Sequence, residues 1–329
     1  AVQLAPDEPE ALFALANYLG ARELDLARAE ALIAKACALD PGQPRFWRLA
    51  ALNTADPVAG LAFAQENVRR FPADALTHYD LSFRYRNLRR WADFERETDA
   101  TLALAPVANT IVWKARAMLG LHGDLAGMRT WLDKVPARVN TQERTVFSRF
   151  LYAVLSGDYD YGFAALRGYT EPWFLDVAEY GGPTALLHAF LFELKGKTAL
   201  ARVQYEAALV EVQRQKLAMP TDLWVRRAEI WALRGLGRLD EARALNRAYA
   251  EIMPRPIVLS PVGGWIFSPA ALSLLLEDRP LALALLREGS DGPSGREALR
   301  VHFQTDPRMK PFRDDPEINV FFQTDKAGK

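Results

Sequence analysis

The chain has 329 residues, and its 41 Lys and Arg are balanced by 41 Asp and Glu, so its formal charge is zero. A nucleic-acid-binding protein is expected to be basic, at least regionally, and this balance argues against that class. Hydrophobic residues make up 50% and charged residues 25% of the sequence, which excludes wholesale disorder. The single cysteine, Cys37, excludes an intrachain disulfide and a cysteine-based metal site. Its alanine-rich surroundings predict a small core residue.

The first helix pair is predicted at residues 11–20 and 26–39. In the second segment, Ala29, Ile33 and Ala36 follow a small, large, small order at helical spacing, and a proline ends the helix shortly afterwards. Small residues let two paired helices approach closely, while the large residue fills the gap between them. The sequence therefore predicts a tight helix hairpin near the start of the chain.

Three further units follow, and they end at Pro72, Pro106 and Pro136. The third unit includes a helix predicted at 91–104, in which Thr98 departs from the small, large, small order. The second unit is short, but the closing prolines stay near the expected spacing, so we predict that the hairpin is repeated.

The pattern weakens beyond residue 140. Residues 171–182 are irregular and rich in aromatic side chains, and we predict no helix for them. Residues 185–194 then pair with 199–217, a second helix that is about two turns longer than the others. The middle of the chain is thus predicted to interrupt the repeats before they resume.

The clearest unit spans residues 221–254. Gly237 begins the turn between its two helices, and Asp240 and Glu241 lie in the first turn of the second helix, where negative charge suits the helix dipole. Pro254 ends that helix. Such a hairpin cannot bury its apolar face alone and needs a neighbour on each side, which is typical of a stacking repeat.

The end of the chain is predicted to close the stack. Residues 269–277 and 281–288 form a last apolar helix pair, and 290–295 form a flexible loop. The tail carries five apolar anchors around two Asp-Pro steps: Phe303, Met309, Phe312, Ile318 and Phe321. We interpret it as a cap, because the open end of a helical stack has to be covered.

The helix-ending prolines recur at a period near 34 residues, apart from one interval of 84 residues. They are Pro6, Pro41, Pro72, Pro106, Pro136, Pro220 and Pro254. With the Gly-x-x-Asp-Glu-Ala sequence at 237–242, this pattern resembles the tetratricopeptide repeat, a protein-interaction module, although Asn246 replaces a large apolar residue of that family. The resemblance implies an all-α, right-handed α-α superhelix with a C-terminal cap. We expect four parts: repeats at 1–136, a degenerate segment at 137–182, repeats at 183–288, and the cap at 289–329.

The tail and the repeats before it resemble the C-terminal helical-repeat half of bacterial signalling proteins. Those proteins carry a kinase, a nucleotide cyclase or a winged-helix domain at the other end. Residues 1–6 look like the end of a repeat's second helix, so we expect the chain to be part of a longer protein. We expect a cytoplasmic location.

The sequence contains no motif of an enzyme or of a cofactor site. Phosphate-binding, dinucleotide-binding, zinc-protease and serine-hydrolase signatures are all lacking, and the four histidines are scattered. Asp158 and Asp160 begin like a calcium loop, but Tyr169 stands at the position of the closing Glu. We therefore predict a non-enzyme without a cofactor or metal.

The uncharged run 259–276 contains two Pro and two Gly and is interpreted as a buried loop and helix rather than a membrane span.

Two stripes of aromatic and polar residues are the candidate binding sites. Residues three or four apart on a helix point the same way, and the first helices of such repeats line the concave face. The predicted ligand-binding residues are Tyr79, Phe83, Arg86 and Asn87 on one helix, and Trp224, Arg227, Trp231 and Arg234 on another. Aromatic rings with arginines are typical of peptide-binding grooves. The alternative is that the rings belong to the core and that the arginines are merely solvated.

We therefore interpret the chain as a non-catalytic interaction or regulatory domain that binds a peptide or protein partner in its concave groove. One alternative is a solenoid that senses a small molecule, with a pocket where residues 173–180 face Trp265. Another is a scaffold for homo-oligomers, which an exposed apolar patch would favour. The basic cluster at 84–90 fits a solvated turn or an acidic partner better than nucleic acid, and the lysines of a chaperone-type carboxylate clamp are missing.

Overall fold

In a computed structural model of the chain, residues 7–19, 25–54, 56–176, 180–253, 265–289 and 293–322 are described. The chain divides into two compact units, residues 1–111 and 112–329. The four parts expected from the sequence stay a prediction. Almost all of the described residues in regular structure are helical, and the exception is one two-stranded sheet. The predicted all-α fold class is confirmed.

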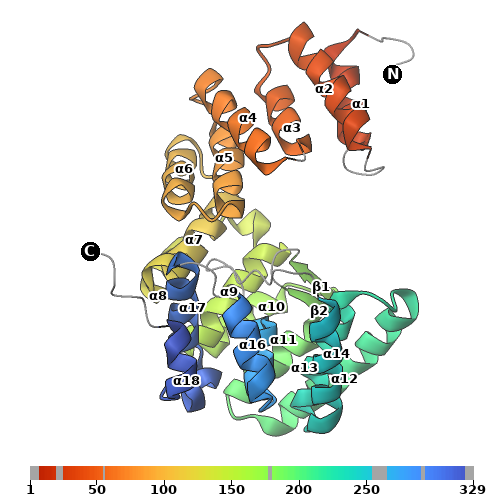
Figure 1. Cartoon of the computed structure of the whole chain (residues 1–329), viewed down its shortest axis with the longest axis vertical. Helices are drawn as coiled ribbons and strands as arrows, with labels where there is room; N and C mark the ends of the chain where they lie inside the picture. The colour runs from red at the N-terminus through yellow and green to blue at the C-terminus, as the bar shows by residue number, and fades with distance from the viewer. Residues whose placement is uncertain are drawn as a thin grey trace. The chain divides into compact units, whose positions relative to one another are not determined.

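The first unit consists of three helix hairpins (Figure 1). Its helices are α1 (Pro9–Tyr18), α2 (Leu26–Leu39), α3 (Pro44–Asn53), α4 (Pro57–Arg70), α5 (Ala75–Asn87) and α6 (Trp91–Leu104). Each helix packs against the next one, and the first helices of neighbouring hairpins also touch, α1 against α3 and α3 against α5. This is the contact pattern of stacked repeats.

Aspartates fix where these helices begin. Asp25, Asp56 and Asp74 precede α2, α4 and α5, and each carboxylate accepts a backbone N–H from the first turn. These N–H groups have no partner within the helix, so the caps stabilise the helix starts. On α2, Ala29 and Ile33 are buried as predicted, which confirms the close approach of the first helix pair.

The second unit continues the hairpins and ends in a cap. Its elements are α7 (Ala108–His122), which starts before the unit boundary, α8 (Leu125–Leu132), η2 (Ala137–Val139), α9 (Glu143–Ser156), α10 (Tyr159–Arg167), β1 (Trp173–Asp176), β2 (Tyr180–Pro183), α11 (Thr184–Leu194), α12 (Thr198–Ala218), α13 (Leu223–Gly235), α14 (Leu239–Ile252), η3 (Trp265–Phe267), α15 (Pro269–Leu275), α16 (Arg279–Gly289), α17 (Pro293–Thr305), η4 (Pro307–Phe312), α18 (Pro316–Asn319) and η5 (Val320–Phe322). Helix α12 has 21 residues, against 14 in α2, α4, α6 and α14, which confirms its predicted extra length.

The aromatic segment that the sequence left irregular is a β-hairpin. Strands β1 and β2 pair antiparallel, with Phe174 opposite Gly182 and Leu175 opposite Gly181. Glycine is required here by close packing, because a Cβ at Gly181 would lie 2.7 Å from the Trp224 ring. The ring of Tyr180 is fully buried, and its hydroxyl donates to the Pro183 carbonyl at 2.9 Å.

An aromatic cluster forms the centre of the second unit. Its members come from three first helices, the hairpin and η3: Phe147, Phe150, Phe174, Tyr180, Phe190, Trp231 and Phe267. Phe267 lies 4.5 Å from Tyr180 and 5.7 Å from Trp231, measured between ring centroids. The hairpin and η3 therefore fill the side of α9, α11 and α13 on which these rings lie.

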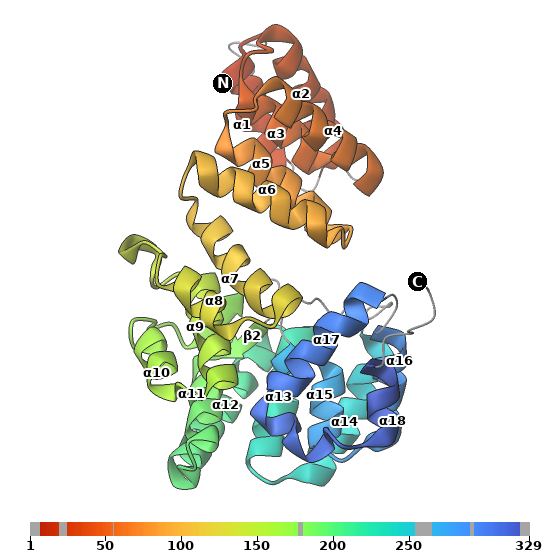
Figure 2. The same ribbon diagram turned by 90° about the vertical axis from the view of Figure 1, so that its left-hand side faces the viewer.

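The C-terminal cap packs as predicted. Phe303, Met309 and Ile318 are buried in the same core, and Phe312 and Phe321 pack against it. The C-terminal helices, drawn in blue, lie against the rest of the second unit in both views (Figures 1 and 2). The predicted loop at 290–295 lies partly outside the described residues, as does the predicted helix end at Pro254.

Candidate binding surfaces

The first helices of the first unit keep one side out of the core. On α3, Arg45, Arg48 and Leu52 lie on that side, at helical spacing. Ion pairs join the corresponding sides of neighbouring helices, Arg45 to Glu10 of α1 and Arg48 to Asp80 of α5. We call the surface formed by the exposed sides of α1, α3 and α5 the first-helix face.

On α5 the first-helix face carries the first predicted stripe. Tyr79, Phe83 and Arg86 are partly exposed and Asn87 is exposed. The guanidinium of Arg86 lies 4.3 Å from the centroid of the Phe83 ring and donates to Asn87 Oδ1 at 3.2 Å. The structure therefore brings these four residues together on one surface. Their role in binding stays a prediction.

Charged side chains lie along this face. Its arginines are Arg45, Arg48 and Arg86, against the two carboxylates Glu10 and Asp80. Nε of Arg48 lies 2.6 Å from Asp80 Oδ2, and both side chains are largely buried. Burial raises the pKa of the Asp80 carboxyl, and the hydrogen bond from Arg48 offsets part of that rise. Arg45 and Arg48 are thus both engaged with carboxylates of neighbouring helices.

The second predicted stripe is not one surface, which corrects our expectation. Trp224 and Arg227 are partly exposed, with the guanidinium 4.1 Å from the centroid of the indole ring. Trp231 is only 1% exposed and packs edge-on against Phe190 at 5.1 Å. The packing alternative therefore holds for Trp231, because η3 and the cap cover the part of α13 on which it lies.

Arg234, the last residue of that stripe, is engaged within the fold. Its Nη1 lies 2.5 Å from Glu193 Oε1, and the hydroxyl of the buried Tyr205 donates to the same carboxylate. Burial lowers the pKa of Arg234, but the charges of Glu193 and Tyr205 and the hydrogen bonds to both side chains together outweigh it, so that the pKa is raised. Arg234 thus stays charged and links α13 to α11.

The small-molecule pocket expected where residues 173–180 face Trp265 stays a prediction. Phe174 and Tyr180 are buried in the aromatic cluster, and residues 177–179 and the side chain of Trp265 lie outside the described part of the chain. The hairpin therefore acts as core.

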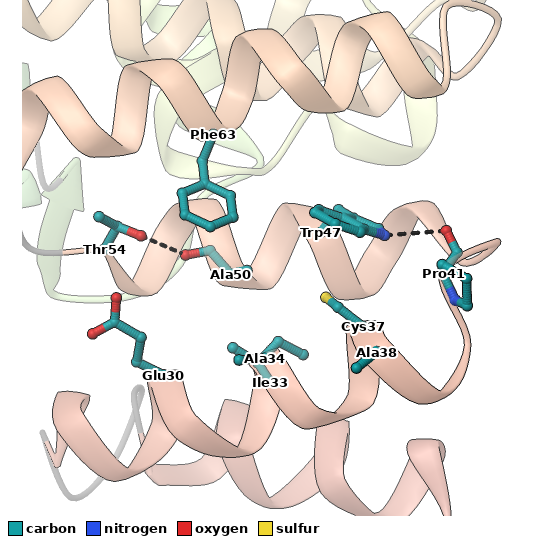
Figure 3. Close-up of a pocket in the computed structure, with 10 residues that line it drawn as sticks. All are labelled: Glu30, Ile33, Ala34, Cys37, Ala38, Pro41, Trp47, Ala50, Thr54 and Phe63. Carbon is teal, nitrogen blue, oxygen red and sulfur yellow. Dashed lines mark hydrogen bonds between the residues drawn. The ribbon is translucent and has the colours of Figure 1, made fainter.

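A groove that we did not predict lies on the other side of α3 (Figure 3). Its volume is about 460 Å³, and its floor is α3 with α2 and α4 as walls. The lining residues are Glu30, Ile33, Ala34, Cys37, Ala38, Pro41, Trp47, Ala50, Thr54 and Phe63. The only sequence signal for it is the set of alanines on α2 and α3, whose small side chains leave the space unfilled.

Most of the polar groups in this groove are already hydrogen-bonded. Trp47 Nε1 donates to the Pro41 carbonyl at 3.1 Å, and Thr54 Oγ1 donates to the Ala50 carbonyl at 2.9 Å. Cys37 lines the groove although it is nearly buried, as predicted, and burial raises the pKa of its thiol to about 11. The groove is thus apolar, with the exposed carboxylate of Glu30 on one wall.

The remaining titratable residues that we considered have structural roles. Asp158 caps α10 by accepting from the N–H of Tyr161, and Asp315 caps α18. His188 Nδ1 lies 3.2 Å from the Thr184 carbonyl. Among the described residues there is no group of three or more His, Cys, Asp or Glu that could hold a metal ion. Within the same part of the chain, no helix is both long and apolar enough to cross a membrane.

Comparison with known proteins gives only distant structural likenesses. No family model matches the chain, and no curated protein matches it. Yeast Tom70 is 13% identical with a TM-score of 0.36, over 97% of this chain and 59% of the Tom70 chain. A tetratricopeptide repeat protein from Parabacteroides merdae is 13% identical with a TM-score of 0.37, over 89% and 98% of the two chains. A structure of Naa15/Naa10 bound to HypK-THB matches at 16% identity and a TM-score of 0.33, over 92% of this chain and 47% of that chain.

The architecture is settled by the chain's own contacts. Successive helices pair, neighbouring first helices touch (α1 with α3, α3 with α5, α9 with α11, α11 with α13), and the apolar tail packs onto the last hairpins. The helix-ending prolines recur near a 34-residue period. The chain is an all-α helical-repeat protein built of tetratricopeptide-like hairpins.

Proposed function

We propose that the chain is a non-catalytic interaction scaffold that binds a peptide segment of a partner protein on the first-helix face. The observation that carries this proposal is the set of apolar groups left exposed there. Leu52 and Leu76 are 51% and 39% exposed, and Tyr79 and Phe83, on the same helix as Leu76, are partly exposed. Isolated apolar residues are normal on a surface, but several on neighbouring helices together with arginines are typical of a binding site.

The chemistry of the face defines the partner. Exposed rings and leucines provide apolar contact area, while arginines provide forks of donors that match carboxylates. A segment with apolar or aromatic side chains next to Asp or Glu would complement both features. The second unit supports placing the binding surface in the first unit. The corresponding helices of the second unit, α9, α11 and α13, are covered by β2 and η3.

The resemblance of the tail to bacterial signalling proteins extends this proposal. In that setting the chain would be the regulatory, cytoplasmic part of a longer protein, and partner binding would be passed on to another domain. Its binding activity is testable without that domain.

Selection from a phage-displayed library of random peptides tests the proposed face. We expect the intact chain to enrich sequences that combine acidic with aromatic or aliphatic residues. The Phe83→Ser/Arg86→Glu variant should bind an enriched peptide at least about tenfold more weakly, a loss of roughly 1.4 kcal/mol, in fluorescence polarisation.

The matched control for this test is Trp224→Ser/Arg227→Glu, which changes a similar aromatic-arginine pair at 4.1 Å in the second unit. It should leave the affinity unchanged. Equal losses in both variants, or enriched peptides without acidic residues, would contradict the proposal. Circular dichroism confirms that each variant is folded.

A second candidate function, the sensing of a small molecule, is favoured by the groove on the other side of α3. Its volume of about 460 Å³ lies within the range of ligand sites. Apolar walls with one carboxylate, that of Glu30, suit an aliphatic or aromatic amine.

Cys37 is the only cysteine of the chain and reports on this groove. Because its thiol has a pKa of about 11, alkylation by iodoacetamide at pH 8 should be at least about a hundredfold slower than that of free cysteine. An alkylamine such as octylamine should slow it further, and Glu30→Gln should remove that protection. Alkylation that octylamine does not slow would argue against an amine site.

A further inference from the structure

Helix α12 has two apolar sides. Ala201, Tyr205, Ala208 and Val212 are buried against the neighbouring helices. The opposite side carries a second apolar line with exposed fractions of 50% for Leu200, 56% for Val203, 72% for Val210 and 90% for Leu217. A helix at the surface normally keeps its outer side polar.

The exposed residues form a continuous line. Val203, Val210 and Leu217 are seven residues apart, so they stand two helical turns apart along about 21 Å of one side of the helix. Leu200 extends the line before Val203, and the exposed Ala207 lies between Val203 and Val210. We call these five residues the α12 stripe. A seven-residue apolar repeat on an exposed side is the pattern that packs against another helix.

Helix α12 is also longer than its partner. It has 21 residues, against 11 in α11, with which it packs side by side (Figure 2). The α12 stripe extends to Leu217, whose side chain is almost fully exposed. The added turns therefore carry the apolar stripe as far as Leu217.

We propose that the α12 stripe is a homodimer interface, in which α12 helices of two copies pair antiparallel about a two-fold axis at Val210. In that register Val210 meets Val210 of the partner subunit, and Val203 meets Leu217 of the partner subunit. Interfaces of this symmetry use the same patch on both copies. The proposal goes beyond partner binding in the first unit and uses a separate surface.

The charges beside the stripe fit this register. Glu206 would face Arg214 of the partner subunit, and the symmetry forms this pair twice. Within one chain these charged groups are exposed, Glu206 at 3.0 Å from Arg202 and Arg214 at 2.6 Å from Glu211. A parallel pairing would instead place glutamate against glutamate and arginine against arginine, which is unfavourable. Charge complementarity therefore favours a second copy of the chain whose α12 helix runs antiparallel to the first.

A hollow beside the stripe gives room for the partner's side chains. Its volume is about 470 Å³, and it lies between α12 and the end of α13. Glu206, Val210 and Gln213 form one wall, and Leu236 and Arg238 lie on the other. A helix docked on the stripe would cover this hollow and exclude water from it.

Sedimentation velocity of the intact chain is the first test. We expect a monomer–dimer equilibrium below about 300 µM, as for a small interface, and Val210→Glu should raise the Kd at least tenfold. Val58→Glu is the matched control, because Val58 is 71% exposed on α4, and it should not change the Kd. A wild-type chain that stays monomeric over this range would overturn the proposal.

A charge exchange tests the orientation. Glu206→Arg and Arg214→Glu should each weaken the dimer, because each places like charges opposite one another. The double variant should restore the wild-type Kd. A double variant weaker than either single variant would contradict the antiparallel register.

Cysteine crosslinking tests the register directly in a Cys37→Ala background. Val210→Cys should form a disulfide-linked dimer on mild oxidation, and so should the Val203→Cys/Leu217→Cys variant. Leu217→Cys alone should remain uncrosslinked, since it faces Val203 of the partner subunit. Efficient crosslinking of Leu217→Cys alone would point to parallel helices and overturn the proposed geometry.

Discussion

Replacing Asp306 with alanine is expected to lower the free energy of unfolding of the second unit by about 3–5 kcal/mol. Asp306 is fully buried, and the Arg308 side chain is 4% exposed. The carboxylate accepts from Arg308 Nη2 at 2.7 Å and from Nε at 3.0 Å. Its removal would leave a guanidinium in the core without its counter-charge.

The position of Arg308 makes that charge costly. Its guanidinium lies 5.2 Å from the Phe190 ring and 5.4 Å from the Trp231 ring, and it donates to the Ile266 carbonyl at 2.8 Å. The cap thus places a charged side chain against α11, α13 and η3. These contacts favour the cation, but water cannot replace the lost carboxylate at such a depth.

Urea unfolding followed by circular dichroism and tryptophan fluorescence measures this effect. Asp314→Ala, an exposed aspartate of the same segment, is the control and should change stability by less than about 0.5 kcal/mol. The Asp306→Ala/Arg308→Met variant should be more stable than Asp306→Ala, because it no longer buries an unpaired charge. If the double variant is the less stable one, the loss comes from packing rather than charge.

Local rules were enough to predict the hairpins and the cap. The order of Ala29, Ile33 and Ala36 depends on residues within two turns of one helix, and these residues are buried. The extra turns of α12 follow from an uninterrupted run of helix-forming residues. The buried Asn246 departs from the family pattern, and its amide donates to Ser273 Oγ at 2.9 Å, which explains how a polar side chain is accommodated there.

The candidate site was less predictable, because burial depends on contacts between distant parts of the chain. Trp224 and Trp231 are equivalent by helical spacing, yet Gly181 packs near one and Phe267 and Arg308 near the other. No periodicity in the sequence predicts that η3 and the cap pack onto α13. The groove beside Cys37 was missed for the opposite reason, since unfilled space leaves little signal in a sequence.

The two units thus use similar helices differently. In the second unit, the hairpin, η3 and the cap occupy the side of the first helices that carries Phe147, Phe190 and Trp231. In the first unit, Leu52, Leu76 and Asn87 are exposed, and Tyr79, Phe83 and Arg86 are partly exposed. We therefore propose partner binding in the first unit and self-association on α12 of the second.

Replacing Trp231 with alanine should lower the free energy of unfolding by about 3–5 kcal/mol. The indole ring is 1% exposed and lies among Phe190, Phe267 and Arg308. Truncating it would remove these contacts and leave a cavity that rigid helices can only partly close.

The matched variant is Trp224→Ala, seven residues earlier on the same helix. Trp224 is partly exposed and packs over Gly181 and Arg227, so its truncation should cost less than half as much, about 1–2 kcal/mol. Urea midpoints of the two variants measure the difference. Equal losses would mean that the hairpin buries Trp224 as deeply as the cap buries Trp231. A small loss for Trp231→Ala would mean that η3 and the cap do not hold α13 in solution. The inner side of the second unit would then be open to a partner, as the sequence first indicated.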